Sequence, residues 1–294
     1  MEDNNIAAGV VRCQIRAIRC HVERLSLYNQ LVEISSNVRK IQRRDCSDDC
    51  LKWLKNSWNT ERILRMSKEY IGDNPFALQW SFPQAYYAVF CLYQALVVAQ
   101  GNCCLSHKAT LKEFAQKIEK KFFPDDFCFS LSGGPKVFFR HNLLECNYEV
   151  LSFNEFDMKS VDSQIFHFLC ATRKECISSH KPEYLKKFKR KRLLKDEDKL
   201  VAAEVENTTL LHLLYRKRIK ANYKDIDTFL SEIIDSEQIC DDLATIVWRV
   251  NSVLEFYISR YIGMKKLENE RKSFDLYAEM NWLAERMRLY CEFK

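Results

Sequence analysis

Glycine and proline are scarce in this chain, which holds 6 glycines and 5 prolines among 294 residues. Sheets joined by tight turns usually need more of both, because glycine supplies the left-handed backbone of many turns and proline presets their first corner. Hydrophobic residues make up 47% of the chain and charged residues 29%, which suits a real core surrounded by long helices with solvated faces. The composition therefore predicts a mainly α fold, as one elaborated domain or two small ones.

Hydrophobic residues recur at helical spacing along most of the chain. From Ile6 to Ile34 this spacing predicts one long amphipathic helix, and a second helix follows over residues 46–71 with Ser47 as its N-cap. Residues 82–99 are almost entirely apolar, which predicts a central helix buried on all sides. Further helices are expected over residues 160–180, 208–223 and 236–267, and a last one reaches Cys291.

Local signals mark the ends of the central helix and the segment that follows it. Pro83 suits a first helical turn, Gly101 suits a C-cap, and Ser106 can cap the next helix. Residues 122–160 are aromatic and irregular, and they contain the adjacent glycines of the letters "SGGP". This segment predicts short strands, with a hairpin across those letters.

Charge and cysteine content indicate the class of protein. The net charge of +6 permits a nucleic-acid partner only if the positive charge is concentrated somewhere. The 13 cysteines are an odd number and follow a polar start, "MEDNNIAAGV", unlike a signal peptide, so we expect free thiols in a reducing cytoplasm. The apolar run 85–99 contains tyrosines and a glutamine and is short for a bilayer, so we expect a soluble protein with no membrane partner.

Two patterns suggest ligands but fit poorly. Cys46, Cys50, Cys103 and Cys104 supply enough thiols for zinc, but the usual CxxC knuckle is missing and apolar residues surround the second pair. Residues 132–136 hold glycines and a lysine, as a phosphate cradle does, but they lack its spacing and read as a simple turn. We therefore expect buried structural thiols, no metal and no cofactor.

A dense basic run is the clearest candidate for contact with phosphate. It places six positive charges in seven residues, with one phenylalanine between them. A solvated loop or helix face accounts for it equally well, and the neighbouring "KDEDK" letters dilute its field. The charged residues of the run are Lys186, Lys187, Lys189, Arg190, Lys191 and Arg192.

Two distant stretches together resemble one family of helical domains. The first is "AYYAVFCLYQALV" at residues 85–97, followed after a short break by the helix start "SHK" at residues 106–108. The second is a helix that leads to Arg218 and then to Ala221, Asn222 and Tyr223, where the family has an "R-x-x-A-D-Y" element. Both stretches resemble the HEPN family (higher eukaryotes and prokaryotes nucleotide-binding).

The resemblance implies a helical bundle with an irregular, partly β insertion and extra terminal helices. It covers roughly residues 60–122 and 205–264. The implied division is an N-terminal helical extension at 1–59, the first part of the bundle at 60–122, an insertion with the basic run at 123–204, the second part of the bundle at 205–264, and a C-terminal helix at 265–294.

The resemblance also implies a function. Many HEPN proteins are metal-independent endoribonucleases of toxin–antitoxin or antiviral defence systems, and they pair face to face as homodimers. In these enzymes a histidine acts on the ribose 2′-hydroxyl or the leaving oxygen, while an arginine neutralises the phosphate. Other members are non-catalytic scaffolds that bind a nucleotide, a nucleotidyltransferase or another defence protein. Both interpretations stay open for this chain, with RNA or a nucleotide as the expected ligand.

The candidate site residues depart from the family pattern. Arg218, Asn222 and Tyr223 occupy the motif, but no histidine follows the arginine. Arg173 and His180 are seven positions apart, nearly two helical turns, so on a helix they would share a face as an alternative catalytic pair. Arg216 and the basic run are the expected RNA-binding residues. His107 is expected to be a helix-start residue rather than a catalyst.

Overall fold

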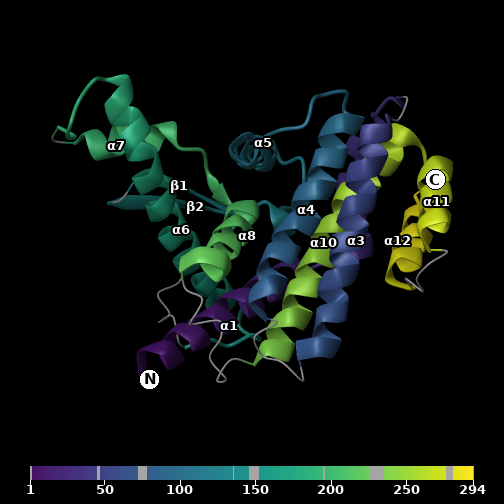
Figure 1. Cartoon of the computed structure of the whole chain (residues 1–294), viewed down its shortest axis with the longest axis horizontal. Coiled ribbons are helices and arrows are strands. Elements are labelled where there is room, and N and C mark those ends of the chain that lie inside the picture. Colours follow the sequence, from purple (N-terminus) through teal and green to yellow (C-terminus); the bar gives the residue numbers. More distant parts are fainter. Residues whose placement is uncertain are drawn as a thin grey trace.

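The protein folds mainly as α-helices with one small sheet, as its composition predicts. The computed structural model describes residues 2–44, 47–71, 78–134, 136–145, 152–194, 196–224, 235–275 and 281–293. Three long helices lie side by side as the core of the bundle (Figure 1). They are α3 (Asp48–Ile71), α4 (Leu78–Ala99) and α10 (Ser236–Ile262).

Helix α4 is the centre of the bundle, because it packs against both α3 and α10 and has almost no exposed face. Among the described helices it is the one whose length and hydropathy would suit a membrane span, but 83% of its apolar window is buried inside the protein. That burial is what a core helix requires. The predicted central helix is therefore confirmed.

The start of α4 differs from the prediction. The helix begins at Leu78, so Pro83 lies in the second turn rather than the first. Because proline has no N–H, one hydrogen bond of that turn is missing. The far end agrees with the prediction: Gly101 has a φ of +81°, the left-handed conformation that suits glycine at a helix end. Ser106 caps α5 (His107–Glu119) by accepting a hydrogen bond from the Ala109 N–H at 3.3 Å.

The N-terminal region forms two helices, so the prediction of one long helix was wrong. Helix α1 (Glu2–Val22) ends before a short turn, and Ser26 caps α2 (Leu27–Arg39) by accepting from the Asn29 N–H at 3.2 Å. At the break, the Leu25 N–H donates to the Asp126 carboxylate at 3.0 Å. A residue a hundred positions away therefore fixes a turn that helical spacing alone cannot indicate.

The predicted hairpin across "SGGP" is present. Strands β1 (Ser130–Gly134) and β2 (Val137–His141) pair antiparallel, with Leu131 opposite Arg140. The short strand β3 (Thr208–Thr209) pairs with the other edge of β1, so the sheet order is β2-β1-β3. A 3₁₀ turn at Asp125–Phe127 precedes the hairpin.

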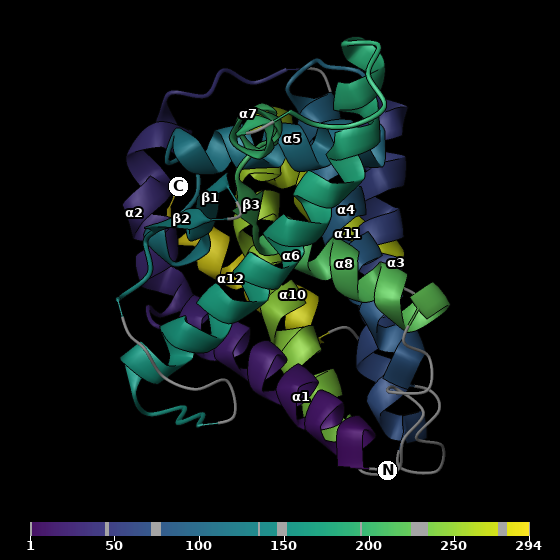
Figure 2. The same ribbon diagram turned by 90° about the vertical axis from the view of Figure 1, so that its left-hand side faces the viewer.

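Helix α6 (Met158–Lys187) is the long element that connects the bundle to an outlying lobe. It packs against α1 near its start, and its far end carries α7 (Glu197–Glu204) (Figure 2). Ile177, Tyr184, Val201 and Ala202 form a small apolar core of this lobe, separate from the main core. The basic run therefore lies at the end of a projecting pair of helices.

The remaining helices complete the bundle. Helix α8 (Leu210–Ile219) packs on α4 and passes into a π-helical turn at Lys220–Lys224. The described parts of the 82–122 and 207–264 segments therefore pack as one bundle. On the other side lie α11 (Met264–Asp275) and α12 (Asn281–Cys291) (Figure 1).

Helix α12 is held to the bundle by a fully buried ion cluster. Arg286 donates to Glu61 of α3 at 2.6 Å and to Glu255 of α10 at 3.4 Å, and all three side chains are 0% exposed. Arg65 reaches the same Glu61 oxygen at 3.3 Å. Burial raises the pKa of Glu255 to about 7, whereas for Glu61 the charges of both arginines outweigh burial and keep its pKa below the ordinary value.

Replacing Arg286 with methionine should destabilise the fold strongly. The change leaves Glu255 without a counter-ion, so we expect the free energy of unfolding to fall by about 3–5 kcal/mol in urea titrations. The loss should be smaller at about pH 5 than at about pH 8, because the abandoned carboxylates can then take up protons. Lys272→Met breaks an exposed pair with Glu268 and should cost less than about 1 kcal/mol. Equal losses for both variants would contradict this role.

Candidate functional site

The last turn of α8 places Arg218 among three tyrosines. Its guanidinium lies 4.8 Å from the ring centre of Tyr87, 5.4 Å from that of Tyr86 and 5.5 Å from that of Tyr215. The first two tyrosines come from α4, so the buried central helix supplies the platform for this charge. Cation–π contacts of this kind orient an arginine without neutralising it.

Arg218 keeps hydrogen-bonding capacity for a ligand. No ion pair or hydrogen bond to its guanidinium occurs within the described part of the chain, and its buried Nε has no hydrogen-bond partner there. A buried donor without a partner is costly, by about 1–3 kcal/mol. The side chain is partly exposed. An anion is the complement that such a group lacks.

His107, the first residue of α5, lies against the same cluster. Its Nδ1 is 2.8 Å from the Tyr86 hydroxyl, and its ring centre is 4.4 Å from that of Phe90 and 6.1 Å from that of Tyr215. Partial burial and the nearby charge of Arg218 lower the pKa of His107 below its ordinary value. The ring is therefore neutral at pH 7, which is the form that can accept a proton.

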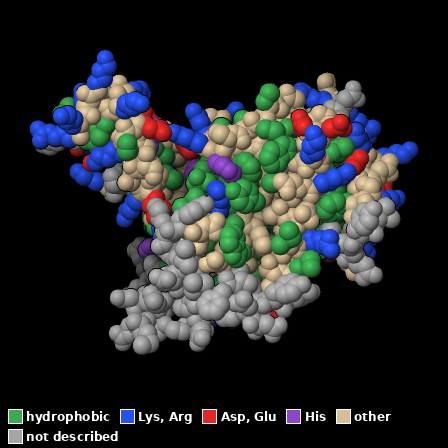
Figure 3. All heavy atoms as spheres, viewed as in Figure 1, with side chains coloured by type: hydrophobic (Ala, Val, Ile, Leu, Met, Phe, Trp, Pro, Cys, Tyr) green, Lys and Arg blue, Asp and Glu red, His purple; other side chains and the backbone are tan. Residues whose placement is uncertain are grey.

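The arginine and the histidine of this cluster come from different helices, and sequence reasoning missed their pairing. Arg218 was singled out, but the histidine sought after it in the sequence is supplied by α5, 111 positions earlier. The signals were present in the letters "YY" at 86–87 and "SHK" at 106–108. What the spacing could not indicate is that α8 crosses α4 beside the start of α5. Figure 3 shows histidine, basic and hydrophobic side chains together on this face.

A cleft of about 540 Å³ adjoins the cluster between α5, α6 and α8. Tyr215 belongs to both, because it contacts Arg218 and also lines the cleft. Leu111 and Ile219 add apolar walls. The polar lining residues include Lys108, Glu175, His180, Glu183, Glu206, His212 and Arg216.

Ion pairs organise the walls of the cleft. Arg216 grips Glu175 with two hydrogen bonds, at 2.7 and 3.1 Å. At the mouth, Lys108 donates to Glu183 at 2.6 Å, and His180 lies between Glu183 and the neighbouring lobe. The predicted RNA-binding residue Arg216 therefore lies in the site, but its guanidinium is already hydrogen-bonded to the carboxylate of Glu175.

Arg173 has a structural role and is not retained as a catalytic residue. Its side chain is 1% exposed and donates to the backbone carbonyls of four residues at 2.6–3.3 Å. No described contact joins it to His180, which instead lies 3.2 Å from a Glu204 oxygen and 3.3 Å from a Glu183 oxygen. The predicted same-face pair fails because α6 turns one residue into the core and leaves the other half-exposed. The four carbonyls belong to Gly133, Ala202, Val205 and Glu206.

The basic run projects into solvent at the end of the α6–α7 lobe, where Figure 3 shows a concentration of Lys and Arg side chains. Lys187 pairs with Glu204 at 2.7 Å, and Arg190 pairs with Glu197. The other basic residues are exposed and have no ion-pair partner among the residues described: Lys186, Lys189, Lys191 and Arg192.

The other predicted residues lie near the site or outside the description. Asn222 is half-buried in the π-helical turn after Arg218. The side chain of Tyr223 and all of Cys46 lie outside the described residues. Of the other cysteines in the proposed zinc set, Cys50 is buried, whereas Cys103 and Cys104 are exposed, contrary to the expected burial. Within the described ranges, no group of three or more metal-binding side chains is present.

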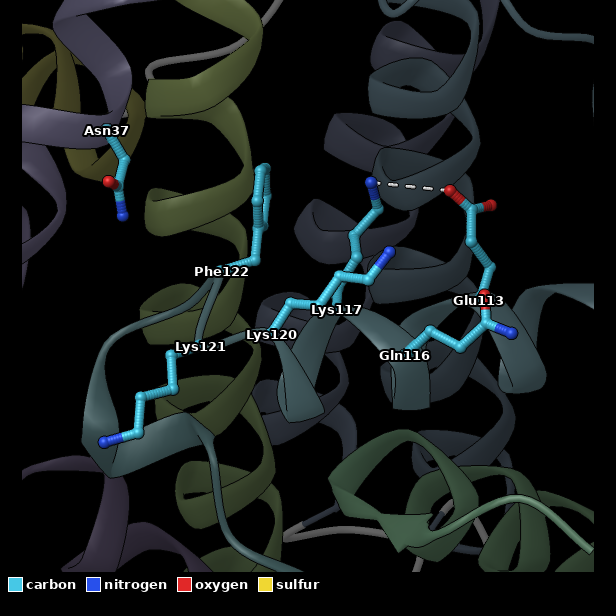
Figure 4. Close-up of a pocket in the computed structure, with 7 residues that line it drawn as sticks. All are labelled: Asn37, Glu113, Gln116, Lys117, Lys120, Lys121 and Phe122. Carbon is cyan, nitrogen blue, oxygen red and sulfur yellow. Dashed lines mark ion pairs between the residues drawn. The ribbon is translucent and has the colours of Figure 1, made fainter.

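A second pocket, of about 370 Å³, lies at the C-terminal end of α5 (Figure 4). Its innermost lysine, Lys117, pairs with Glu113 at 3.4 Å, donates to Gln100 at 3.1 Å and lies 4.7 Å from the Phe122 ring centre. Lys117 is therefore paired, and no residue that lines this pocket has a buried polar atom without a hydrogen-bond partner in the described chain, whereas Arg218 does. We assign the site to the cleft and that cluster.

Comparison with known proteins found no matching family model, no matching curated protein and no matching solved structure. The interpretation of the site therefore rests on its own geometry.

Removing the charge of Arg218 should raise the pKa of His107. Arg218→Gln removes a positive charge that disfavours the imidazolium, so the pKa should move up toward the ordinary value of 6.5. A pH titration of the His107 ring signals by NMR measures this shift. Arg39→Gln changes an exposed arginine on α2 and should leave the titration unaltered. If the His107 pKa is unchanged in both variants, Arg218 and His107 are not electrostatically coupled.

Proposed function

We propose that the protein binds RNA and cleaves it without a metal at the Arg218–His107 cluster. The observation that carries this proposal is the pairing of an unneutralised arginine with a neutral histidine beside an open cleft. RNA carries its own nucleophile, the 2′-hydroxyl, so a base and a cation at the phosphate suffice for cleavage. This is the chemistry of HEPN-like endoribonucleases, supplied here by two helices instead of one motif.

His107 acts as the base. When its Nδ1–H donates to the Tyr86 oxygen, the lone pair on Nε2 is free, and Nε2 has no hydrogen-bond partner among the described residues. Nε2 takes the proton of the 2′-hydroxyl, and the 2′-oxygen attacks phosphorus. The bond from phosphorus to the 5′-oxygen breaks, and the proton on His107 is then available for that leaving oxygen.

Arg218 stabilises the charge that develops on the phosphate. Its planar fork can donate two hydrogen bonds to one phosphoryl group, and the tyrosines hold the fork in place before the ligand arrives. The products are a 2′,3′-cyclic phosphate and a 5′-hydroxyl.

The basic run supplies affinity rather than chemistry. Four of its charges are exposed and unpaired in the described structure, and it lies on a lobe connected to the cleft by α6. The RNA backbone on either side of the cleaved phosphate would contact this lobe. Such contacts with phosphates do not depend on the base sequence. The same proposal places the protein in a defence system, with a nucleotidyltransferase or another protein as its partner. It also includes a face-to-face homodimer.

A non-catalytic nucleotide-binding scaffold is the second candidate. It is favoured by the lack of a histidine after Arg218, because Asn222 in that stretch can hydrogen-bond a phosphate but cannot relay a proton. In that case Arg218 and His107 would hold a nucleotide phosphate without cleaving RNA.

Cleavage assays with RNA in EDTA test the proposal. We expect His107→Gln to lower the cleavage rate about 10²–10⁴-fold, because the base is lost. Arg218→Lys should lower it about 10²–10³-fold, because the charge stays but the two-pronged contact is lost. Mass spectrometry should find the 2′,3′-cyclic phosphate.

Matched variants away from the site control for general damage. His141→Gln changes an exposed histidine of the hairpin, and Arg39→Lys changes an exposed arginine of α2; both should cleave like the wild type. Cleavage that persists in His107→Gln and Arg218→Lys would remove the site assignment. Absence of cleavage in the wild type, with nucleotide binding that depends on Arg218, would favour the scaffold.

Replacing the four unpaired basic residues of the lobe with glutamine should weaken RNA binding for every sequence alike. Each lost phosphate contact removes about 0.7 from the slope of log affinity against log salt for a single strand, so the slope should fall by up to about 3. Fluorescence anisotropy across a salt series measures it. The control replaces four lysines on α3 and α11 and should leave the slope unchanged: Lys52, Lys265, Lys266 and Lys272. Equal effects from both sets would contradict a role for the lobe.

A further inference from the structure

His212 lines the cleft, and its buried ring Nε2 makes no hydrogen bond within the described part of the chain. Its side chain is 3% exposed, and its Nδ1 lies 3.3 Å from the Thr209 backbone nitrogen. Because that nitrogen is a donor, Nδ1 must accept, so the neutral ring carries its proton on Nε2. Nε2 is buried and has no hydrogen-bond partner among the described residues. A Glu206 oxygen lies 3.5 Å from Nε2, which is within ion-pair distance but long for a hydrogen bond.

Glu206 places two acceptor oxygens beside this donor. Burial opposes its charge, but His212 and Lys108 outweigh burial and keep the pKa of Glu206 below its ordinary value, so the group is ionised. Its backbone carbonyl accepts from Arg173 at 2.6 Å, which fixes the residue in the wall of the cleft. The cleft therefore presents a fixed row of one N–H donor followed by a carboxylate.

The space above this row suits a flat ring. Tyr215, Leu111 and Ile219 give it aromatic and apolar walls, and the volume of about 540 Å³ holds a nucleobase with its ribose. Tyr215 also touches Arg218, so a base in the cleft is next to the phosphate position of the cluster. A base with an acceptor followed by two N–H donors would satisfy the whole row.

We propose that the cleft binds guanine, and that the protein cleaves RNA beside guanosines. Guanine presents O6, N1–H and the N2 amino group in that order, which matches His212 Nε2–H followed by both oxygens of Glu206. Adenine offers one amino donor and no second N–H. Uracil places a carbonyl oxygen against the carboxylate of Glu206, and cytosine places two acceptors against it. The claim about cleavage rests on the proposed function, whereas the claim about binding does not.

Inosine gives a test that leaves the protein unchanged. It differs from guanosine only by the missing N2 amino group, so one hydrogen bond to Glu206 is lost. Oligoribonucleotides with a single guanosine, inosine or adenosine in an otherwise uridine strand are compared in EDTA. We expect cleavage beside guanosine to be about 10-fold faster than beside inosine, and at least about 10-fold faster than beside adenosine. Equal rates at the three positions would overturn the inference and leave RNA cleavage standing.

Binding of mononucleotides separates this inference from catalysis. Calorimetry with guanosine, inosine and adenosine 3′-monophosphates on His107→Gln protein should give the tightest binding for guanosine. Glu206→Gln should remove the preference, because an amide offers one acceptor and one donor, whereas Glu119→Gln, on the exposed side of α5, should keep it. Guanine-selective binding without any RNA cleavage by the wild type would support the cleft and remove the proposed function. Equal affinities for the three nucleotides would overturn the inference.

Discussion

The architecture of the site depends on the hydrogen bonds of one buried arginine. Arg173 on α6 donates to carbonyls of the hairpin, of the last turn of α7 and of the segment that leads into β3. These backbone carbonyls lie near the ends of β1 and α7 and in the segment before β3. By satisfying them, a single side chain joins the bundle, the small sheet and the projecting lobe. It also fixes the segment that carries Glu206 into the cleft.

The second determinant is the central helix, which both fills the core and supports the Arg218–His107 cluster. Most of α4 is buried, and two adjacent tyrosines, the buried Tyr86 and the partly exposed Tyr87, lie against Arg218 where α8 crosses α4. A rigid helix is a better support for a catalytic group than a loop, because packing locks the rotamers around it. The cluster of Arg218 and His107 therefore inherits its geometry from the core.

The sequence predicted the helices well where hydrophobic spacing and capping agree. Ser47, Gly101 and Ser106 mark helix ends in the structure as they do in the sequence, and the glycines of the hairpin lie at its turn. The sequence-based predictions failed where a residue distant in the sequence determines the local structure. The break between α1 and α2 depends on a bond from Leu25 to Asp126, which no local pattern reveals.

The site was predictable only in part, for the same reason. Arg218 could be chosen from its motif, but its partner His107 lies on another helix, and contact between them is a property of the packing. Arg173 was misjudged because seven-residue spacing does not indicate which part of a helix is buried. Guanine recognition by Glu206 and His212 left no signal in the sequence that spacing could detect.

The ion cluster of Arg286 has a consequence for how the protein is made. Glu61 and Glu255 lie in helices that leave the ribosome early and late, and the arginine that neutralises them both comes later still, on α12. Until that helix emerges, closing α3 against α10 would bury Glu255 without a cation, whereas Glu61 already has Arg65 of its own helix. The bundle can therefore reach its full stability only after α12 has been synthesised.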